Sequence, residues 1–90
     1  MIENGTIAVK IMSPVAVVWE VQASAVSAEN TEGIFDILPD HARFMSLISN
    51  APVTIELPDE SLKTFTFENA MLFFEDNKLT IYIQEHLESV

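Results

Sequence analysis

The sequence contains no cysteine and only two glycines. The first absence excludes a disulfide framework and thiolate-based zinc or redox chemistry, and it favours a reducing compartment. The second leaves too little glycine for a phosphate-binding loop. No apolar run approaches the roughly 18 residues of a membrane-spanning helix, and the first residues lack the basic and apolar regions of a secretory signal. We therefore expect neither membrane insertion nor export by that route.

Positive charge is also scarce, with four Lys and Arg residues against 14 Asp and Glu and a net charge of -10. Such a surface repels phosphates and anionic lipids, which argues against nucleic acid or membrane lipid as the main partner. It is compatible with a basic or polar protein partner, or with a charge that only keeps a small domain soluble. With 49% apolar residues in a chain of 90, the composition supports one folded domain.

The dominant pattern is alternation of apolar and polar residues, which is typical of half-buried strands, and helical periodicity is nearly absent. Five segments alternate clearly: residues 6–11, 17–22, 53–57, 64–67 and 79–84. Turn residues separate them at Pro58-Asp59-Glu60-Ser61 and at Asp76-Asn77, and Gly33 marks a position that needs backbone freedom. An open sheet would leave its apolar face in water. The pattern therefore predicts an all-β, two-layer antiparallel β-sandwich of about ten short strands in residues 1–84, followed by a frayed polar tail at 85–90.

Three blocks of the sequence carry a family resemblance. The segment EGIFDILPDHARFMSLI (residues 32–48) resembles EGxFGILPGHAPLxTxL of the epsilon subunit of F-type ATP synthases, without a gap. IMSPVAVVWE (11–20) is similar to the opening strand and turn of that family, and NAMLFFEDNKLTIYI (69–83) to its late hairpin GGFLEVxDNxVTVL. Together the blocks extend over residues 6–84.

The sequence departs from this family pattern at a few positions. Asp36 and Asp40 stand where the family has glycine, Arg43 where it has proline, and Asn69-Ala70 where it has a glycine pair. Aspartate and asparagine can adopt the left-handed conformation, whereas Ala70 would be strained if that conformation were required. Family members also carry a C-terminal helical hairpin that damps ATP hydrolysis. This sequence stops near the last strand, as a naturally short subunit or a shortened chain, so we expect coupling and assembly without inhibition.

The resemblance implies a non-catalytic rotor subunit in the central stalk, which couples the gamma subunit to the membrane c-ring during proton-driven ATP synthesis. It implies no cofactor and no small-molecule substrate, and a place at the cytoplasmic face of the energy-transducing membrane, reached through the complex. By family position, the gamma-facing candidates are Ser13, His41, Ser46 and Met71. The c-ring-facing candidates are Thr31, Glu32, Gly33 and Ile34. Ile34 replaces an acid that the family often has, for which Glu32 or Asp36 could substitute.

Each candidate also has a purely structural interpretation. His41 could be a corner residue hydrogen-bonded to nearby backbone, and Trp19 is more readily a core residue than an interface anchor. Phe73 and Phe74 must point to opposite faces of a strand, so one of them faces outward.

Other function classes find little support. A nucleophilic Ser13 or Ser46 would need His41 and an aspartate, but no nucleophile elbow or oxyanion-hole motif accompanies them. Asp36, Asp40 and His41 lack the dense ligand pattern of a metal site. The alternative that stays open is a free acidic β-sandwich adaptor unrelated to ATPases, which would have no affinity for gamma.

Overall fold

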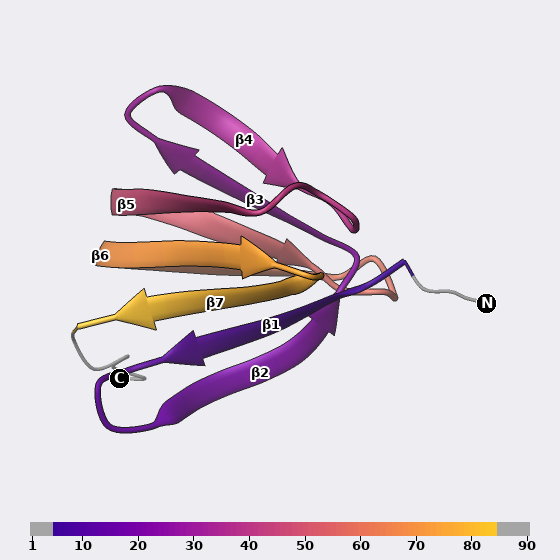
Figure 1. The fold of residues 1–90 in the computed structure, drawn as a ribbon, viewed down its shortest axis with the longest axis horizontal. Coiled ribbons are helices and arrows are strands. Elements are labelled where there is room, and N and C mark those ends of the chain that lie inside the picture. Colours follow the sequence, from indigo (N-terminus) through magenta and orange to yellow (C-terminus); the bar gives the residue numbers. More distant parts are fainter. Residues whose placement is uncertain (1–4, 85–90) are drawn as a thin grey trace.

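The structure is a computed structural model that describes residues 5–84, so the tail predicted at 85–90 lies outside the described residues. Within that range it consists of β-strands and turns without a helix, which confirms the all-β prediction (Figure 1). No helix of the described part is therefore available to cross a membrane. The strands are β1 (Ile7–Met12), β2 (Val17–Ala23), β3 (Ala25–Asn30), β4 (Gly33–Ile37), β5 (Phe44–Glu56), β6 (Leu62–Glu75) and β7 (Lys78–Ile83).

All seven strands of the described range join in one hydrogen-bonded sheet, in the order β2-β1-β7-β6-β5-β3-β4. The sheet is mixed, because β1 pairs with β7 in parallel while every other neighbouring pair is antiparallel. The expectation of a purely antiparallel arrangement was therefore wrong for this pair. A period of two reports which side a residue faces but not the direction of the neighbouring strand, so the pattern could not reveal it.

The expected number of about ten strands is too high for the described residues, because β5 and β6 are long. They span 13 and 14 residues and keep one continuous register, from Phe44 opposite Phe74 to Glu56 opposite Leu62. The sequence pattern suggested breaks inside them because alternation fails there. In β5 the inward side chains change from even positions, ending at Ile48, to odd positions, starting at Ala51. In β6 the reverse change, from odd to even positions, falls between Phe67 and Ala70.

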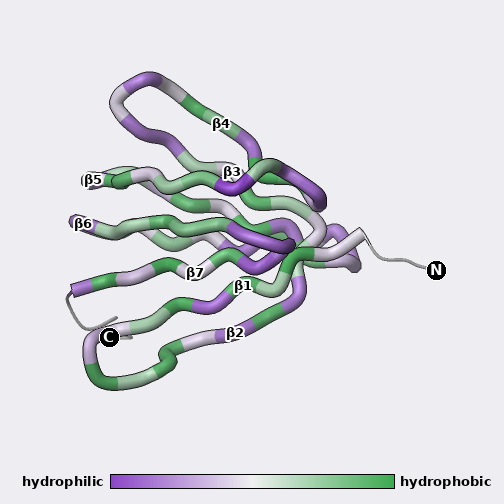
Figure 2. The backbone as a smooth tube through the Cα atoms, viewed as in Figure 1, coloured by the Kyte–Doolittle hydropathy of each residue, from purple (hydrophilic) through white to green (hydrophobic). Residues whose placement is uncertain are grey.

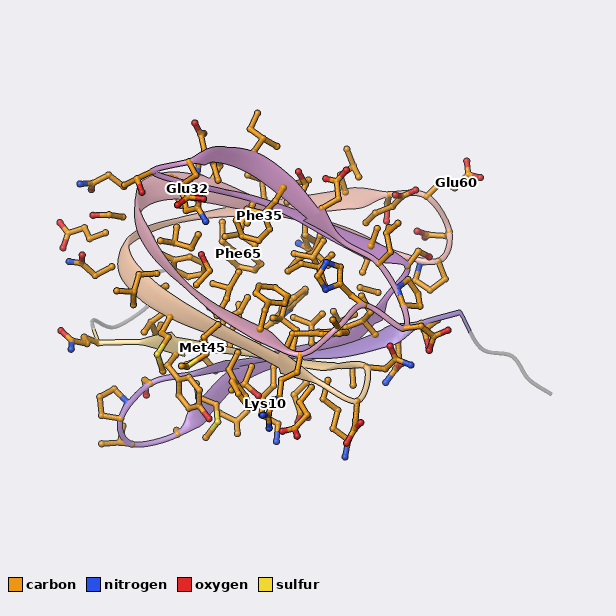
Figure 3. The ribbon with its side chains drawn as sticks, turned by 45° about the horizontal axis from the view of Figure 1, so that its top comes forward. Lys10, Glu32, Phe35, Met45, Glu60 and Phe65 are labelled. Atoms are coloured by element: carbon orange, nitrogen blue, oxygen red, sulfur yellow. The ribbon has the colours of Figure 1, made fainter. Side chains whose placement is uncertain are left out.

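This change of facing lets both halves of the long hairpin contribute to one core. Asn50, with a φ of 53°, sits at the change in β5 and is exposed. Trp19 of β2 contacts Phe65 of β6 at a ring-centroid distance of 5.0 Å, although three strand spacings separate β2 from β6 in the sheet. Figure 3 shows Phe35 and Phe65 in the interior, between ribbons that lie above and below them. The sheet therefore curves strongly around its apolar side.

Every fully buried side chain of the described residues is apolar. The largest are Phe67 and Phe74, with no exposed surface. Trp19 is partly buried and packs against this core, which confirms its predicted structural role. Phe73 lies on the other side of β6 from Phe74 and is only partly buried, as the opposite-faces argument required.

The turn predictions hold at the positions that need a left-handed backbone. Asp76 and Asn77 have φ values of 54° and 60°, and Gly33 has a φ of 124°. Asp40, at a family glycine position, adopts a φ of 68°, whereas Ala70 is not among the residues with positive φ and carries no such strain.

Candidate partner-binding surface

An unusual row of exposed and partly exposed apolar side chains crosses the outer face of five neighbouring strands. Its members are aligned by the strand register: Leu47 lies opposite Met71, Met71 opposite Tyr82, and Tyr82 opposite Met12. A β-bulge near the end of β1 then places Val17 of β2 opposite Met12. We call Val17, Met12, Tyr82, Met71 and Leu47 the apolar row. Four strand spacings of about 4.8 Å make it roughly 19 Å wide.

The members of the apolar row face away from the core. Ile11, Leu72 and Ile81 stand beside Met12, Met71 and Tyr82 in the sequence and are completely buried, and successive side chains of a strand point to opposite sides. Leu47 is 73% exposed, Val17 47% and Tyr82 42%. Figure 2 shows that the β1–β2 turn at the end of this row is also hydrophobic, and Val15 at its tip is 82% exposed. Aligned exposed apolar residues of this extent are typical of an interaction surface.

The next row on the same face is mixed, and the third is polar. This second row lies two residues further along β5, β6, β7 and β1, where the register aligns Met45, Phe73, Thr80 and Lys10. It ends on β2 with Glu20, which lies opposite Lys10. The third row contains Glu75, Lys78, Ala8 and Gln22. Lys10 pairs with Glu20 at 3.9 Å and Arg43 with Glu75 at 3.4 Å, both in solvent-exposed positions. Such pairs contribute about 0 to 1 kcal/mol each, so the apolar residues dominate the binding potential of this face.

The outer face of the other part of the sheet is polar. There the register aligns Asp36, Ser27, Thr54 and Thr64 across β4, β3, β5 and β6. The hydroxyl oxygens of Thr54 and Thr64 lie 3.2 Å apart and share a hydrogen bond. This face offers no comparable apolar row, so the two outer faces of the domain differ in character.

The four residues proposed to face gamma do not form one cluster. Met71 lies within the apolar row, between Tyr82 and Leu47, and Ser13 lies in the turn directly after Met12. The Ser13 hydroxyl accepts hydrogen bonds from the backbone N–H groups of Val15 and Ala16, so it stabilises that turn. Ser46 is on the inward side of β5, where its hydroxyl accepts a hydrogen bond from the Asn30 side chain at 3.0 Å.

His41 lies at the opposite end of the strands from Ser13, in the connection between β4 and β5. Its ring packs edge-on against Phe44 and Phe74, at centroid distances of 5.1 and 6.0 Å. Its Nδ1 is 2.9 Å from the carbonyl oxygen of Ala42, and its backbone N–H donates to the carbonyl oxygen of Leu38. This is the geometry of the structural interpretation, in which His41 closes one end of the core.

The four residues proposed to face the c-ring are contiguous at the tip of the β3–β4 hairpin. Thr31 and Glu32 form its two-residue turn, in which the Glu32 N–H donates to the Asn30 side chain. Gly33 supplies the positive φ that follows, and Ile34 is 75% exposed on the edge strand β4. A groove lined in part by Thr31, Glu32, Ser46 and Leu47 connects this tip with one end of the apolar row.

Sequence reasoning missed most of the apolar row. Val17 and Tyr82 were read only as members of alternating strands, and Met12 and Leu47 lay outside the five alternating segments. The alignment of these residues depends on strand register, which alternation does not report. Tyr82 carried the clearest sequence signal of an outward apolar residue, because it stands at a position of Lys78–Ile83 where the alternation calls for a polar side chain.

The described residues do not assemble a catalytic or metal-binding arrangement. Neither Ser13 nor Ser46 is hydrogen-bonded to His41, and residues 5–84 hold no group of three His, Asp or Glu side chains placed to bind a metal ion. The pKa of Asp59 is lowered by the hydrogen bond from the Ser61 hydroxyl and then by that from the Ser61 N–H. Asp59 lies in the β5–β6 turn, away from both candidate surfaces.

Comparison with known proteins agrees with this architecture. Residues 6–88 match the family model described as ATP synthase, Delta/Epsilon chain, beta-sandwich domain. The ATP synthase epsilon chain of Corynebacterium efficiens is 34% identical over 76 residues, which are 83% of this chain and 61% of the relative. That of Nitratiruptor sp. is 25% identical over 79 residues, 88% of this chain and 61% of the relative. The chain thus spans about three fifths of the length of these relatives.

Two solved structures share the fold. A chain of the Euglena gracilis mitochondrial ATP synthase (OSCP/F1/c-ring) superposes with a TM-score of 0.82 at 12% identity, over 91% of this chain and 52% of the other. A chain from the central stalk and c-ring of the Tetrahymena thermophila mitochondrial ATP synthase gives 0.69 at 16% identity, over 88% and 63%. At such identities the likeness concerns the fold alone. The match over residues 6–88 shows that the chain belongs to the family of ATP synthase delta/epsilon chain beta-sandwich domains.

Proposed function

We propose that this chain is a non-catalytic subunit of the central stalk of an F-type ATP synthase, and that it binds the gamma subunit through the apolar row. The observation that carries the proposal is the register that aligns Val17, Met12, Tyr82, Met71 and Leu47 on one outer face. Family membership and the likeness to a chain from an ATP synthase central stalk and c-ring support a partner within such an assembly, and the family resemblance of the sequence points to gamma. The task of such a subunit is mechanical coupling of gamma to the c-ring during proton-driven synthesis.

We further propose that the strongly curved sheet is a two-layer β-sandwich. Its support is the contact between Trp19 and Phe65 from strands that are distant in the sheet, together with the change of facing in β5 and β6. A sandwich presents two outer faces, of which one carries the apolar row and the other carries the polar row of Asp36, Ser27, Thr54 and Thr64. The polar face then stays in solvent while the apolar face is covered.

We assign the hairpin tip Thr31-Glu32-Gly33-Ile34 to the c-ring, which places the protein at the cytoplasmic membrane surface only through the complex. The tip lies at the end of a two-strand projection, away from the middle of the apolar row (Figure 1). One subunit can therefore contact gamma and the c-ring at once. Asn30, the last residue of β3 before the tip, donates a hydrogen bond to Ser46 and so holds the tip end of the hairpin against β5.

The gamma contact is tested by placing a charge in the apolar row. Leu47→Glu should weaken binding to the purified gamma subunit by about thirtyfold, the effect of losing an interface contact worth about 2 kcal/mol. Thr66→Glu is the matched control, since it adds the same charge at an exposed strand position outside the apolar row. Trp19 emission and circular dichroism establish that both variants fold. Equal affinity of the two variants would refute the assignment.

Cross-linking separates the two partners. Because the chain lacks cysteine, a single introduced thiol is the sole reactive one. Met71→Cys should cross-link to gamma in the assembled enzyme, and Thr31→Cys to the c subunit. Absence of any gamma binding would favour the free adaptor, and exchange of the two products would overturn the orientation.

A further inference from the structure

The few cations of this acidic chain are unevenly distributed. Lys10 belongs to the second row and Lys78 to the third, and Arg43 pairs with Glu75 of the third row. Lys63 lies apart from them, at the far end of β6 opposite Ile55. The carboxylates of β3, β4 and the end of β5, Glu29, Asp36 and Glu56, belong to the other part of the sheet. Figure 3 shows Lys10 and Glu60 on opposite sides of the molecule. The second and third rows of the candidate binding face hold Lys10 and Lys78 beside Glu20 and Glu75, so the two signs are balanced there, whereas acidic residues outnumber basic ones in the rest of the described chain.

The two lysines on the sheet flank a small residue. Ala8 lies opposite Lys78, and Lys10, two residues further along β1, lies opposite Thr80. The side chains of Ala8, Lys10, Lys78 and Thr80 all face outward and line one shallow groove, whose floor is low because alanine has no side chain beyond Cβ. Lys10 is engaged only by the exposed Glu20 at 3.9 Å. Within residues 5–84, Lys78 has no carboxylate partner inside 4 Å.

We propose that the gamma segment that covers the apolar row carries carboxylates along the edge that lies over Lys10 and Lys78. This inference rests on the proposed function and specifies the chemistry of the partner at the same surface. Ala8 and Lys78 lie four residues along the strands from the apolar row, a distance of about 13 Å, with one row between. One amphipathic segment can therefore contact both. The apolar contact supplies most of the affinity, and the charge pairs fix which way the segment lies.

The net charge of -10 does not prevent an acidic segment from binding here. The molecule extends over 38 × 28 × 22 Å, whereas the Debye length at physiological ionic strength is about 8 Å. Carboxylates on the opposite side are therefore largely screened from this groove, whose own lining carries Lys10 and Lys78 against one carboxylate, Glu20.

The test is charge reversal with a matched control, measured as binding to the purified gamma subunit. Lys78→Glu and Lys10→Glu should each weaken binding by about three- to tenfold at ~50 mM salt, and by less than about twofold at ~500 mM salt. Lys63→Glu changes the net charge by the same amount at a site outside the binding face, and it should bind like the wild type at both salt concentrations. Trp19 emission serves as the folding control for all three variants.

The outcomes distinguish this inference from the proposed function. If Leu47→Glu abolishes binding while both lysine reversals bind normally, gamma docks on the apolar row but the acidic edge is refuted. If Lys63→Glu weakens binding as much as Lys78→Glu, the effect comes from net charge, and the local inference fails. If the wild-type chain does not bind gamma at all, the proposed function itself fails.

Discussion

Asn77 joins two turns that are far apart in the sequence, and its replacement tests how much they depend on each other. Its side-chain oxygen accepts a hydrogen bond from the Asp40 N–H, and its side-chain nitrogen donates to an Asp40 carboxylate oxygen at 3.0 Å. Its carbonyl oxygen also accepts a hydrogen bond from the N–H of Ala8 in β1. Asn77 holds a φ of 60° and Asp40 a φ of 68°. The pair therefore fastens the connection before β5 to the β6–β7 turn.

The expected loss follows from these contacts. Asn77→Ala removes two side-chain hydrogen bonds, which at an exposed site are worth about 1 to 2 kcal/mol together. Alanine at positive φ adds about 1 kcal/mol of strain, so the free energy of unfolding should fall by about 2 to 3 kcal/mol. For a domain of this size that corresponds to a decrease in Tm of roughly 8 to 20 °C. Asn77→Gly removes the same hydrogen bonds without the strain and should cost about 1 kcal/mol less.

Urea and thermal unfolding, followed by Trp19 emission, measure these differences. Asp76 provides the matched control, because it has a φ of 54° in the same turn and an exposed side chain. Asp76→Ala should show the strain of about 1 kcal/mol, and Asp76→Gly close to none. If Asn77→Ala and Asp76→Ala destabilise the protein equally, the hydrogen bonds to Asp40 contribute nothing and the reasoning is refuted.

Three further perturbations test other parts of the fold. Phe67→Ala should lower the free energy of unfolding by about 3 to 5 kcal/mol, because Phe67 is fully buried, and Phe67→Leu should lower it by clearly less. If denaturant titrations give equal losses for the two variants, the loss does not come from core packing. Gly33→Ala should destabilise by about 1 to 2 kcal/mol through its φ of 124° alone, since an added Cβ meets no atom within 4 Å; an unchanged Tm would show that the turn relaxes. Ser61→Ala should raise the pKa of Asp59 toward its ordinary value, as followed by NMR titration of the carboxyl carbon. Because folding lowers the pKa of Asp59, its carboxylate stabilises the folded state at pH above its unfolded pKa, and this stabilisation disappears as the pH falls through its folded pKa. Ser61→Ala should therefore lose stability at neutral pH, but not at a pH below both the folded and the unfolded pKa.

Local features of the fold were predictable from residues alone. Alternation placed Ile7, Val9 and Ile11 on the buried side of a strand, and Asp76-Asn77 specified a tight hairpin turn that the structure contains. These properties depend on neighbours in the sequence, either through the two-residue period or through the φ that a residue tolerates. The alternation failed inside β5 and β6 because both strands change facing there while their register continues.

The candidate site was less predictable for the same reason. Met71 was anticipated and belongs to the apolar row, but Ser46 proved to face inward, where it accepts a hydrogen bond from Asn30. Contiguous candidates such as Thr31 to Ile34 stay together in any fold, whereas candidates from separate strands meet only if the register aligns them.

By itself, the sequence determined that the chain forms strands, which side of most of them is buried, where the tight turns fall, and which family it resembles. Only the tertiary structure decided that β1 runs parallel to β7, that Trp19 reaches Phe65, and that five apolar residues from five strands stand in one row. Burial and turn preference act between near neighbours along the chain. Strand order and register are set by contacts between distant segments, for which a period of two contains no information.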